Sequence, residues 1–211
     1  MITYNIKNNK GFTIIEALIA IFILSVSVVS MLGMTSKSTS SARYANNEIT
    51  ANYLLQEAID SIRNSRDTIA FQKKEDVSQG GWKNFLYRYG YDMSTGSASK
   101  CFSAAGCYLE TAKFNGEDIN GGDIKLCNIV ITTENPTGCP VLDLDVSDTS
   151  SFAYIYKNSD FTPSVFSRKV TMEKVTDDEI KVTAYVSWNN GNGTNPNTQK
   201  LEVSLLNWIN D

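Results

Sequence analysis

The sequence predicts an α+β fold, in which a long N-terminal helix packs on a C-terminal antiparallel β-sheet. Three patterns lead to this expectation. An apolar run occupies residues 12–34, apolar residues recur at helical spacing from residue 44 onward, and apolar and polar residues alternate near the C-terminus. The first proline is Pro136, so no proline forces the helix to end early.

The chain begins with a short polar segment, residues 1–11, whose charged side chains are Lys7 and Lys10. Residues 12–34 follow as 23 apolar or small residues with one charge among them. A helix of this length rises about 34 Å, enough to cross a hydrocarbon core about 30 Å thick. We therefore expect one membrane-spanning helix. Basic residues lie on both sides of it and favour a cytoplasmic N-terminus by a small margin.

Glu16 is the one ionisable side chain in this apolar run. An acidic residue opposes insertion by about 2.5–3.5 kcal/mol at the bilayer centre, and by less near an interface. The strongly apolar residues around Glu16 outweigh that cost. Insertion of residues 12–34 therefore remains favourable.

Residues 35–66 are more polar and predict an amphipathic continuation of the same helix. The Ser/Thr run at 35–41 is a weak point, where we expect a kink or a frayed turn. Beyond it, one helical face collects the apolar side chains of Tyr44, Ala51, Leu55, Ala58, Ile59 and Ile62. Glu57, Asp60 and Asn64 fall on the opposite face. The apolar face must therefore be buried against another part of the chain.

Residues 67–165 are rich in turn signals, and we expect loops and short strands there. The C-terminal part is more regular, because apolar and polar residues alternate over 166–175, 180–188 and 200–208, with turn residues between these segments. Residues 165–207 therefore predict a three-stranded antiparallel meander. The apolar faces of this sheet and of the helix can cover each other.

The chain has four cysteines, Cys101, Cys107, Cys127 and Cys139. Their spacing does not fit a zinc site, and an even number beyond an apolar N-terminus indicates an oxidising compartment. Three disulfide pairings are possible, and buried free thiols are the alternative. The simplest pairing joins nearest neighbours, and on the loop-entropy model each short loop would contribute roughly 2–3 kcal/mol.

The composition excludes several classes of function. The 211 residues include no histidine, which removes histidine-based catalysis and histidine metal sites. No phosphate-binding, dinucleotide-binding or hydrolase motif is present. The net charge of −4 predicts no large basic surface, so no nucleic-acid partner is inferred. We therefore predict no enzyme: no catalytic residues, no metal site and no cofactor.

Two groups of residues are candidate binding sites. Asp143, Asp145 and Asp148, and the acidic stretch 115–123, lack the spacing of an EF-hand calcium loop and are interpreted as solvated acidic loops. A second group contains aromatic side chains able to contact a ligand, for which core packing is the preferred interpretation: Trp82, Tyr87, Tyr89 and Tyr91.

The stretch Gly11-Phe12-Thr13-Ile14-Ile15-Glu16 resembles the cleavage and methylation motif of type IV prepilins. The resemblance implies that a peptidase on the cytoplasmic face cuts after Gly11 and that the new amine of Phe12 is methylated. It also implies that Glu16, the fifth residue of the mature chain, pairs with the N-terminal amine of a neighbouring subunit. The segment 52–68, "NYLLQEAIDSIRNSRDT", and the C-terminal strands are similar to those of PilV-like minor prepilins.

This resemblance implies a structural subunit of a type IV pilus. Residues 1–11 would be the leader, 12–34 the transmembrane and filament-core helix, 35–66 its amphipathic continuation, and 67–211 the globular pilin head. The implied partners are other pilin subunits, the prepilin peptidase and methyltransferase, the pilus assembly platform and the membrane. The chain would cross the cytoplasmic membrane once, with its C-terminal domain outside, before joining a pilus at the cell surface.

Alternatives remain open at this stage. In many major pilins a disulfide brackets the C-terminal region, but here no cysteine follows Cys139, which favours a minor pilin or a pseudopilin of a type II secretion system. A membrane-anchored surface binding protein or adhesin is a third interpretation. A secretory signal peptide ending near residues 25–27 is disfavoured by Glu16 inside the apolar region.

Overall fold

The computed structural model describes residues 11–72, 81–110, 123–128, 135–145, 153–156, 162–189 and 196–208. The chain divides into two compact units, residues 1–46 and 47–211, and each is described by itself. Of the leader predicted at residues 1–11, all but Gly11 lies outside the described residues.

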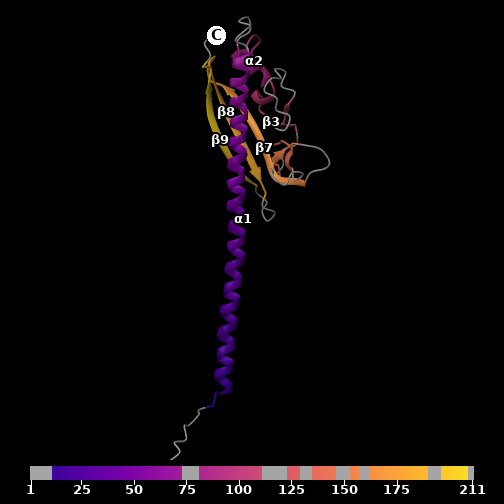
Figure 1. Cartoon of the computed structure of the whole chain (residues 1–211). Coiled ribbons are helices and arrows are strands. Elements are labelled where there is room, and N and C mark those ends of the chain that lie inside the picture. The colour runs from indigo at the N-terminus through magenta and orange to yellow at the C-terminus, as the bar shows by residue number, and fades with distance from the viewer. Residues whose placement is uncertain are drawn as a thin grey trace, which may run out of the picture. The chain divides into compact units, whose positions relative to one another are not determined.

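The predicted N-terminal helix is α1, Ile14–Gln72, which extends six residues further than the expected end at Arg66 (Figure 1). Its first turn is closed by the Thr13 carbonyl, which accepts hydrogen bonds from the amides of residues 16 and 17. Residues 35–41 are helical throughout, so the frayed turn predicted there is wrong. The Thr35 and Thr39 hydroxyls each donate to the carbonyl four residues earlier, which satisfies them within the helix.

The C-terminal unit contains a seven-stranded antiparallel sheet. Its largest part is the predicted meander, made of β7 (Thr162–Lys174), β8 (Glu179–Trp188) and β9 (Asn197–Leu206). On the side away from β8, β7 pairs with two shorter strands, β3 (Cys107–Leu109) and β5 (Val141–Asp145). These pair in turn with β4 (Ile124–Leu126) and β6 (Ala153–Ile155). A separate hairpin consists of β1 (Tyr91–Asp92) and β2 (Ser97–Ala98).

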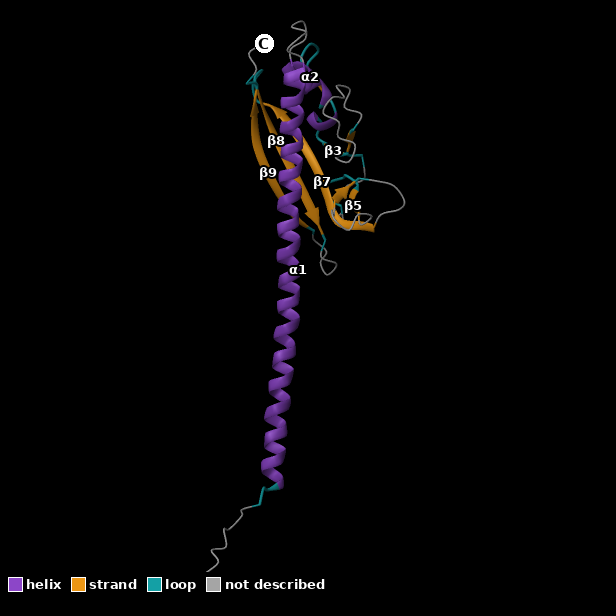
Figure 2. Cartoon of the chain, in the orientation of Figure 1, coloured by secondary structure: helices purple, strands orange, loops and turns teal. Residues whose placement is uncertain are grey.

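Within the C-terminal unit, the helix covers the meander, which confirms the predicted fold class. Figure 2 shows this part of α1 running beside β7, β8 and β9. The helix contributes the buried side chains of Ala51, Leu54, Leu55, Ala58, Ile59, Ile62 and Ile69. The strands contribute those of Phe166, Val170, Met172, Ile180, Val182, Ala184, Val186, Trp188 and Leu205. The apolar helix face from Ala51 onward and the apolar sheet face therefore form one core. Tyr44, which the sequence placed on the same helix face, is 42% exposed, so the prediction is wrong for Tyr44.

A second helix, α2 (Gly81–Arg88), lies in a segment where loops and short strands were expected. Four apolar side chains with the spacing i, i+3, i+4 and i+7 are buried: Trp82, Phe85 and Leu86 in α2, and Tyr89 directly after it. The centroid of the Phe85 ring lies 5.4 Å from that of Trp82 and 4.9 Å from that of Tyr89. The segment is helical because this spacing gives it one continuous face to bury.

Candidate functional site

The sequence motif at residues 11–16 lies where the described chain enters α1. Gly11, Phe12 and Thr13 are not helical, and Glu16 lies in the first helical turn, where its negative charge is favoured by the helix dipole. Phe12 is 72% exposed, and a Cβ atom added at Gly11 would meet no heavy atom within 4 Å. The Gly11–Phe12 bond is therefore uncovered by the rest of the described chain.

The apolar side chains that follow are exposed, which is unusual for residues of this type. The large ones are 49–85% exposed: Phe12, Ile14, Ile15, Leu18, Ile19, Ile21, Phe22, Ile23, Leu24, Val26, Val28, Val29, Met31, Leu32 and Met34. Among the described residues, α1 is the one helix long and apolar enough to cross a membrane. Its most apolar 18-residue stretch has a mean hydropathy of 2.5, and none of that stretch is buried.

The three serine side chains in the same segment are hydrogen-bonded within the helix. The hydroxyls of Ser25, Ser27 and Ser30 donate to backbone carbonyls three or four residues earlier at 2.8–2.9 Å. A hydroxyl that is bonded within its own helix can enter an apolar environment without an unsatisfied donor. Glu16 is then the one residue in 12–34 whose chemistry opposes that environment.

In the C-terminal unit, Arg168 joins the sheet to the helix. Its side chain is 1% exposed, and its guanidinium lies 3.1 Å from both the Leu54 carbonyl and a carboxylate oxygen of Glu57. The Arg168 carbonyl accepts a hydrogen bond of 2.9 Å from the hydroxyl of Tyr156. Burial raises the pKa of Tyr156 to about 12, so this hydroxyl keeps its proton at neutral pH. The alternation over 166–175 placed Arg168 on the apolar face but did not reveal that the residue is buried.

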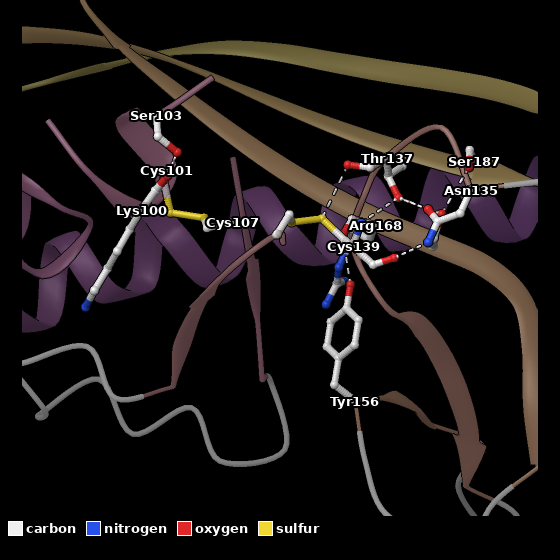
Figure 3. Close-up of a disulfide and its surroundings, with 12 residues drawn as sticks. Lys100, Cys101, Ser103, Cys107, Asn135, Thr137, Cys139, Tyr156, Arg168 and Ser187 are labelled. Atoms are coloured by element: carbon white, nitrogen blue, oxygen red, sulfur yellow. Dashed lines mark hydrogen bonds between the residues drawn. A yellow bond between two sulfur atoms is a disulfide. The ribbon is translucent and has the colours of Figure 1, made fainter. Parts of the chain in front are cut away.

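The four cysteines form two disulfides, Cys101–Cys107 and Cys127–Cys139 (Figure 3). Their Cα atoms lie 4.6 and 4.5 Å apart, and all four side chains are buried. This is the nearest-neighbour pairing among the three possible. The Thr137 hydroxyl, beside the second disulfide, lies 2.9 Å from that of Ser167 on β7, so the disulfide-bonded loop is held against the sheet.

The stretch 115–123 was interpreted as a solvated acidic loop, and for Asp123 this is wrong. Asp123 is 6% exposed and its carboxylate accepts a hydrogen bond of 2.7 Å from Arg88, which is fully buried. The rest of that stretch, the side chain of Asp145 and all of Asp148 lie outside the described residues. In the described part of the chain, no three potential metal ligands come together.

The four aromatic residues singled out from the sequence differ in exposure. Trp82 and Tyr89 are buried, as expected, and the Trp82 indole donates to the Asp177 carbonyl at 2.8 Å. Burial raises the pKa of Tyr89 far above its ordinary value. Tyr91 is half-buried, but Tyr87 is 57% exposed, so the expectation of core packing is wrong for Tyr87.

Comparison with known proteins gives one match. The profile of the prokaryotic N-terminal methylation motif matches residues 6–32, which include Gly11, Phe12 and Glu16. No curated protein and no solved structure matches the chain. The matched motif is consistent with a type IV prepilin-like protein, and it supports a pilin-like or pseudopilin protein.

The matched motif also has consequences for processing and location. It suggests a structural subunit, and it implies processing by a prepilin peptidase and assembly with other pilins in a membrane-associated system. Together with the exposed apolar helix, it suggests membrane anchoring with the C-terminal domain outside.

Proposed function

We propose that the protein is a minor pilin, a structural subunit of a type IV pilus or a related filament, and not an enzyme. A prepilin peptidase removes the leader, residues 1–11, and the amine of Phe12 is methylated. Residues 12–34 first cross the cytoplasmic membrane and then enter the filament core. Residues 35–66 continue that helix, and residues 67–211 form the pilin head.

One observation carries the proposal: the matched motif is followed directly by a helix with its apolar side chains exposed. Such a surface is unfavourable in water by about 25 cal/mol per Å² of apolar area. A lipid bilayer removes that cost, and so does a bundle of like helices. Moving from bilayer to filament therefore keeps residues 12–34 away from water at each stage.

Glu16 favours the transfer of the subunit from the bilayer to the filament. Residues 12–34 contain no basic side chain that could pair with its carboxylate, and opposite charges attract more strongly in a low-dielectric medium than in water. In the proposed filament, the new amine of Phe12 on a neighbouring subunit supplies the opposite charge. Assembly then relieves a cost that remains while the subunit is alone in the membrane.

The minor-pilin assignment rests on the disulfides. Both lie between Cys101 and Cys139, so neither brackets β9 at the C-terminal end of the chain. A pseudopilin of a type II secretion system has the same motif and remains the alternative. The identity of the neighbouring genes would distinguish the two assignments. A membrane-anchored adhesin would also expose an apolar helix, but it would keep residues 1–11.

Mass spectrometry of the chain recovered from its own cells tests the proposal. The expected N-terminus is methylated Phe12, while an intact Met1, or a cut after residue 25, would contradict it. Gly11→Val should block the cut without disturbing the fold, because a Cβ at Gly11 meets no neighbouring atom. Gly33→Val is the matched control, since Gly33 has the same free space but lies outside the motif.

Purified filaments test the assembly role. The subunit is expected in them at a small ratio to the main subunit, and its absence from pili would exclude the minor-pilin assignment. Glu16→Gln should lower incorporation at least tenfold while leaving the membrane-bound amount unchanged. If Glu16→Gln is incorporated as well as wild type, charge pairing does not drive recruitment.

A further inference from the structure

A polar hollow of about 350 Å³ lies in the C-terminal unit, between the end of α2 and the β1–β2 hairpin. Its volume falls within the range of small-molecule sites. The side chains that line it include Tyr87, Asp92, Thr95, Ser97, Ser99 and Lys100. The N-terminal motif and the helix–sheet core involve none of these residues.

Tyr87 is the aromatic residue in the lining of this hollow. The three largest apolar residues around it on α2, Trp82, Phe85 and Leu86, are buried, whereas Tyr87 is 57% exposed. Packing does not account for a large aromatic residue at this position. An exposed tyrosine ring offers a flat apolar face with a polar hydroxyl at its edge.

Hydrogen bonds and backbone conformation fix three residues of the lining, Gly90, Ser99 and Lys100. Gly90 has φ +99°, and a Cβ there would lie 2.4 Å from the Ser99 carbonyl oxygen. The Ser99 amide and hydroxyl donate to the Gly90 carbonyl at 2.7 and 3.1 Å. Lys100 has φ +45°, which is costly for a residue with a side chain, and the next residue is the disulfide-bonded Cys101. A site formed before binding loses little conformational entropy when a ligand arrives.

The hollow carries one charge of each sign. The Asp92 carboxylate accepts hydrogen bonds of 2.8 Å from the Ser94 amide and the Thr95 hydroxyl, which hold its pKa below the ordinary value. The Lys100 ammonium lies 3.5 Å from the Arg88 carbonyl, and its side chain extends away from the disulfide in Figure 3. The Thr95 and Ser99 hydroxyls already donate within the protein, so they offer acceptor oxygens to a ligand, and the Ser97 hydroxyl can both donate and accept.

The lining favours one class of ligand. Asp92 and Lys100 carry opposite charges, so together they favour neither an anion nor a cation, and a metal ion would find only one carboxylate in the lining. A wholly apolar ligand would bury polar groups without partners. A neutral molecule with many hydroxyls and one apolar face can hydrogen-bond to the polar groups and contact Tyr87. We propose that this hollow binds a neutral saccharide, which stacks on Tyr87 and hydrogen-bonds to Asp92, Ser97 and Lys100.

The test uses the full chain in a polyoxyethylene alkyl ether detergent, whose headgroup carries neither a sugar nor a charge. The probes are methyl glycosides of glucose, galactose, mannose and N-acetylglucosamine, and binding is measured by saturation-transfer NMR titration. At least one probe should bind with a Kd of about 1 mM. Tyr87→Phe should retain this affinity within about threefold, because the ring remains. Tyr87→Ala and Tyr87→Leu should weaken it at least tenfold, because both remove the ring.

Tyr53→Ala is the matched control, since Tyr53 is 68% exposed on α1 and should leave saccharide binding unchanged. The proposal is overturned if none of the four probes binds at roughly 50 mM. It is also overturned if binding survives both Tyr87→Ala and Tyr87→Leu, or is lost equally in Tyr53→Ala. Incorporation of Tyr87→Leu into filaments should match wild type, which separates the fate of this proposal from that of the minor-pilin proposal.

Discussion

Helix α1 carries two kinds of apolar surface. In residues 12–34 the large apolar side chains are exposed, whereas in residues 47–70 one face of the helix buries its apolar side chains and Ile49 and Tyr53 stay exposed. Ile23 is 60% exposed and Ile62 is 0% exposed, although both are isoleucines within the same helix. The arrangement of apolar residues, and not their number alone, therefore indicates whether their partner lies in the same chain. The described chain leaves the apolar side chains of residues 12–34 uncovered, while the C-terminal unit buries its helix face against its own sheet.

The largest effect should come from making one substitution in both regions. Ile62→Ala should lower the free energy of unfolding of the C-terminal unit by about 3–4 kcal/mol, because it leaves a cavity in the core. Ile23→Ala should change it by less than about 0.5 kcal/mol. Urea titration of the full chain in detergent, followed by tryptophan fluorescence, measures the free energy of unfolding of the C-terminal unit, because Trp82, Trp188 and Trp208 all lie in that unit. A comparable loss in both variants would show that the two regions do not unfold separately.

Arg168 tests whether the helix is held on the sheet by polar contacts as well as by apolar packing. Arg168→Met should cost about 2 kcal/mol, because it removes the charged hydrogen bond to the Leu54 carbonyl and the contact to the partly exposed Glu57. Arg63→Met is the matched control, since the Arg63–Asp60 pair is exposed and should contribute less than about 0.5 kcal/mol. The same urea titration measures both. Equal costs would mean that burial adds nothing to the Arg168 contacts.

The disulfides distinguish the two regions further, because both lie in the C-terminal unit. The variant with Cys127→Ala and Cys139→Ala should lose roughly 2–3 kcal/mol of stability. The variant with Cys101→Ala and Cys107→Ala should lose about 0.6 kcal/mol less, because its loop spans 6 residues and not 12. Thermal unfolding of each double variant measures this difference. A larger loss from the shorter loop would show that packing around the disulfide, and not chain entropy, sets its contribution.

The sequence predicted the parts of this fold that have a long regular period. Residues 12–34 and the strands of the meander are each ten or more residues long, so their patterns identify them. Strands β3, β4 and β6 have three residues each, which is too short for a period of two to be recognised. Helix α2 has the spacing of a helix but only eight residues, and the surrounding turn signals outweighed it.

Charged residues were the other source of error, because burial of a charge depends on a partner that is distant in sequence. Asp123 is buried because Arg88 lies beside it, 35 residues away in the chain. Arg168 contacts Leu54 across 114 residues. The residues next to each charge in the sequence do not predict its distant partner. The motif at residues 11–16, in contrast, is entirely local, and it was recognised from six adjacent residues.

The smallest expected effect concerns alkaline pH and the C-terminal unit. The Tyr156 pKa is raised to about 12 by burial, against about 10 in an unfolded chain. The contribution of this neutral hydroxyl is therefore complete below pH 10 and is lost as the pH rises towards 12, at roughly 1.4 kcal/mol per pH unit. Tyr156→Phe removes both the titration and the hydrogen bond to the Arg168 carbonyl, which is worth about 1 kcal/mol.

The variant Tyr156→Phe should accordingly be about 1 kcal/mol less stable than wild type at pH 8, and this gap should close by pH 11. Urea titrations at pH 8, 10 and 11 measure it, and Tyr53→Phe, on an exposed part of the helix, should show no gap at any pH. Tyr89, whose pKa is also raised by burial, is present in all three proteins, so its own titration cancels from the differences. A gap that stays constant with pH would mean that the Tyr156 hydroxyl ionises in the folded unit as readily as in the unfolded chain. The contact between Tyr156 and Arg168 would then be open to water, and Arg168 would hold the helix less firmly than its burial implies.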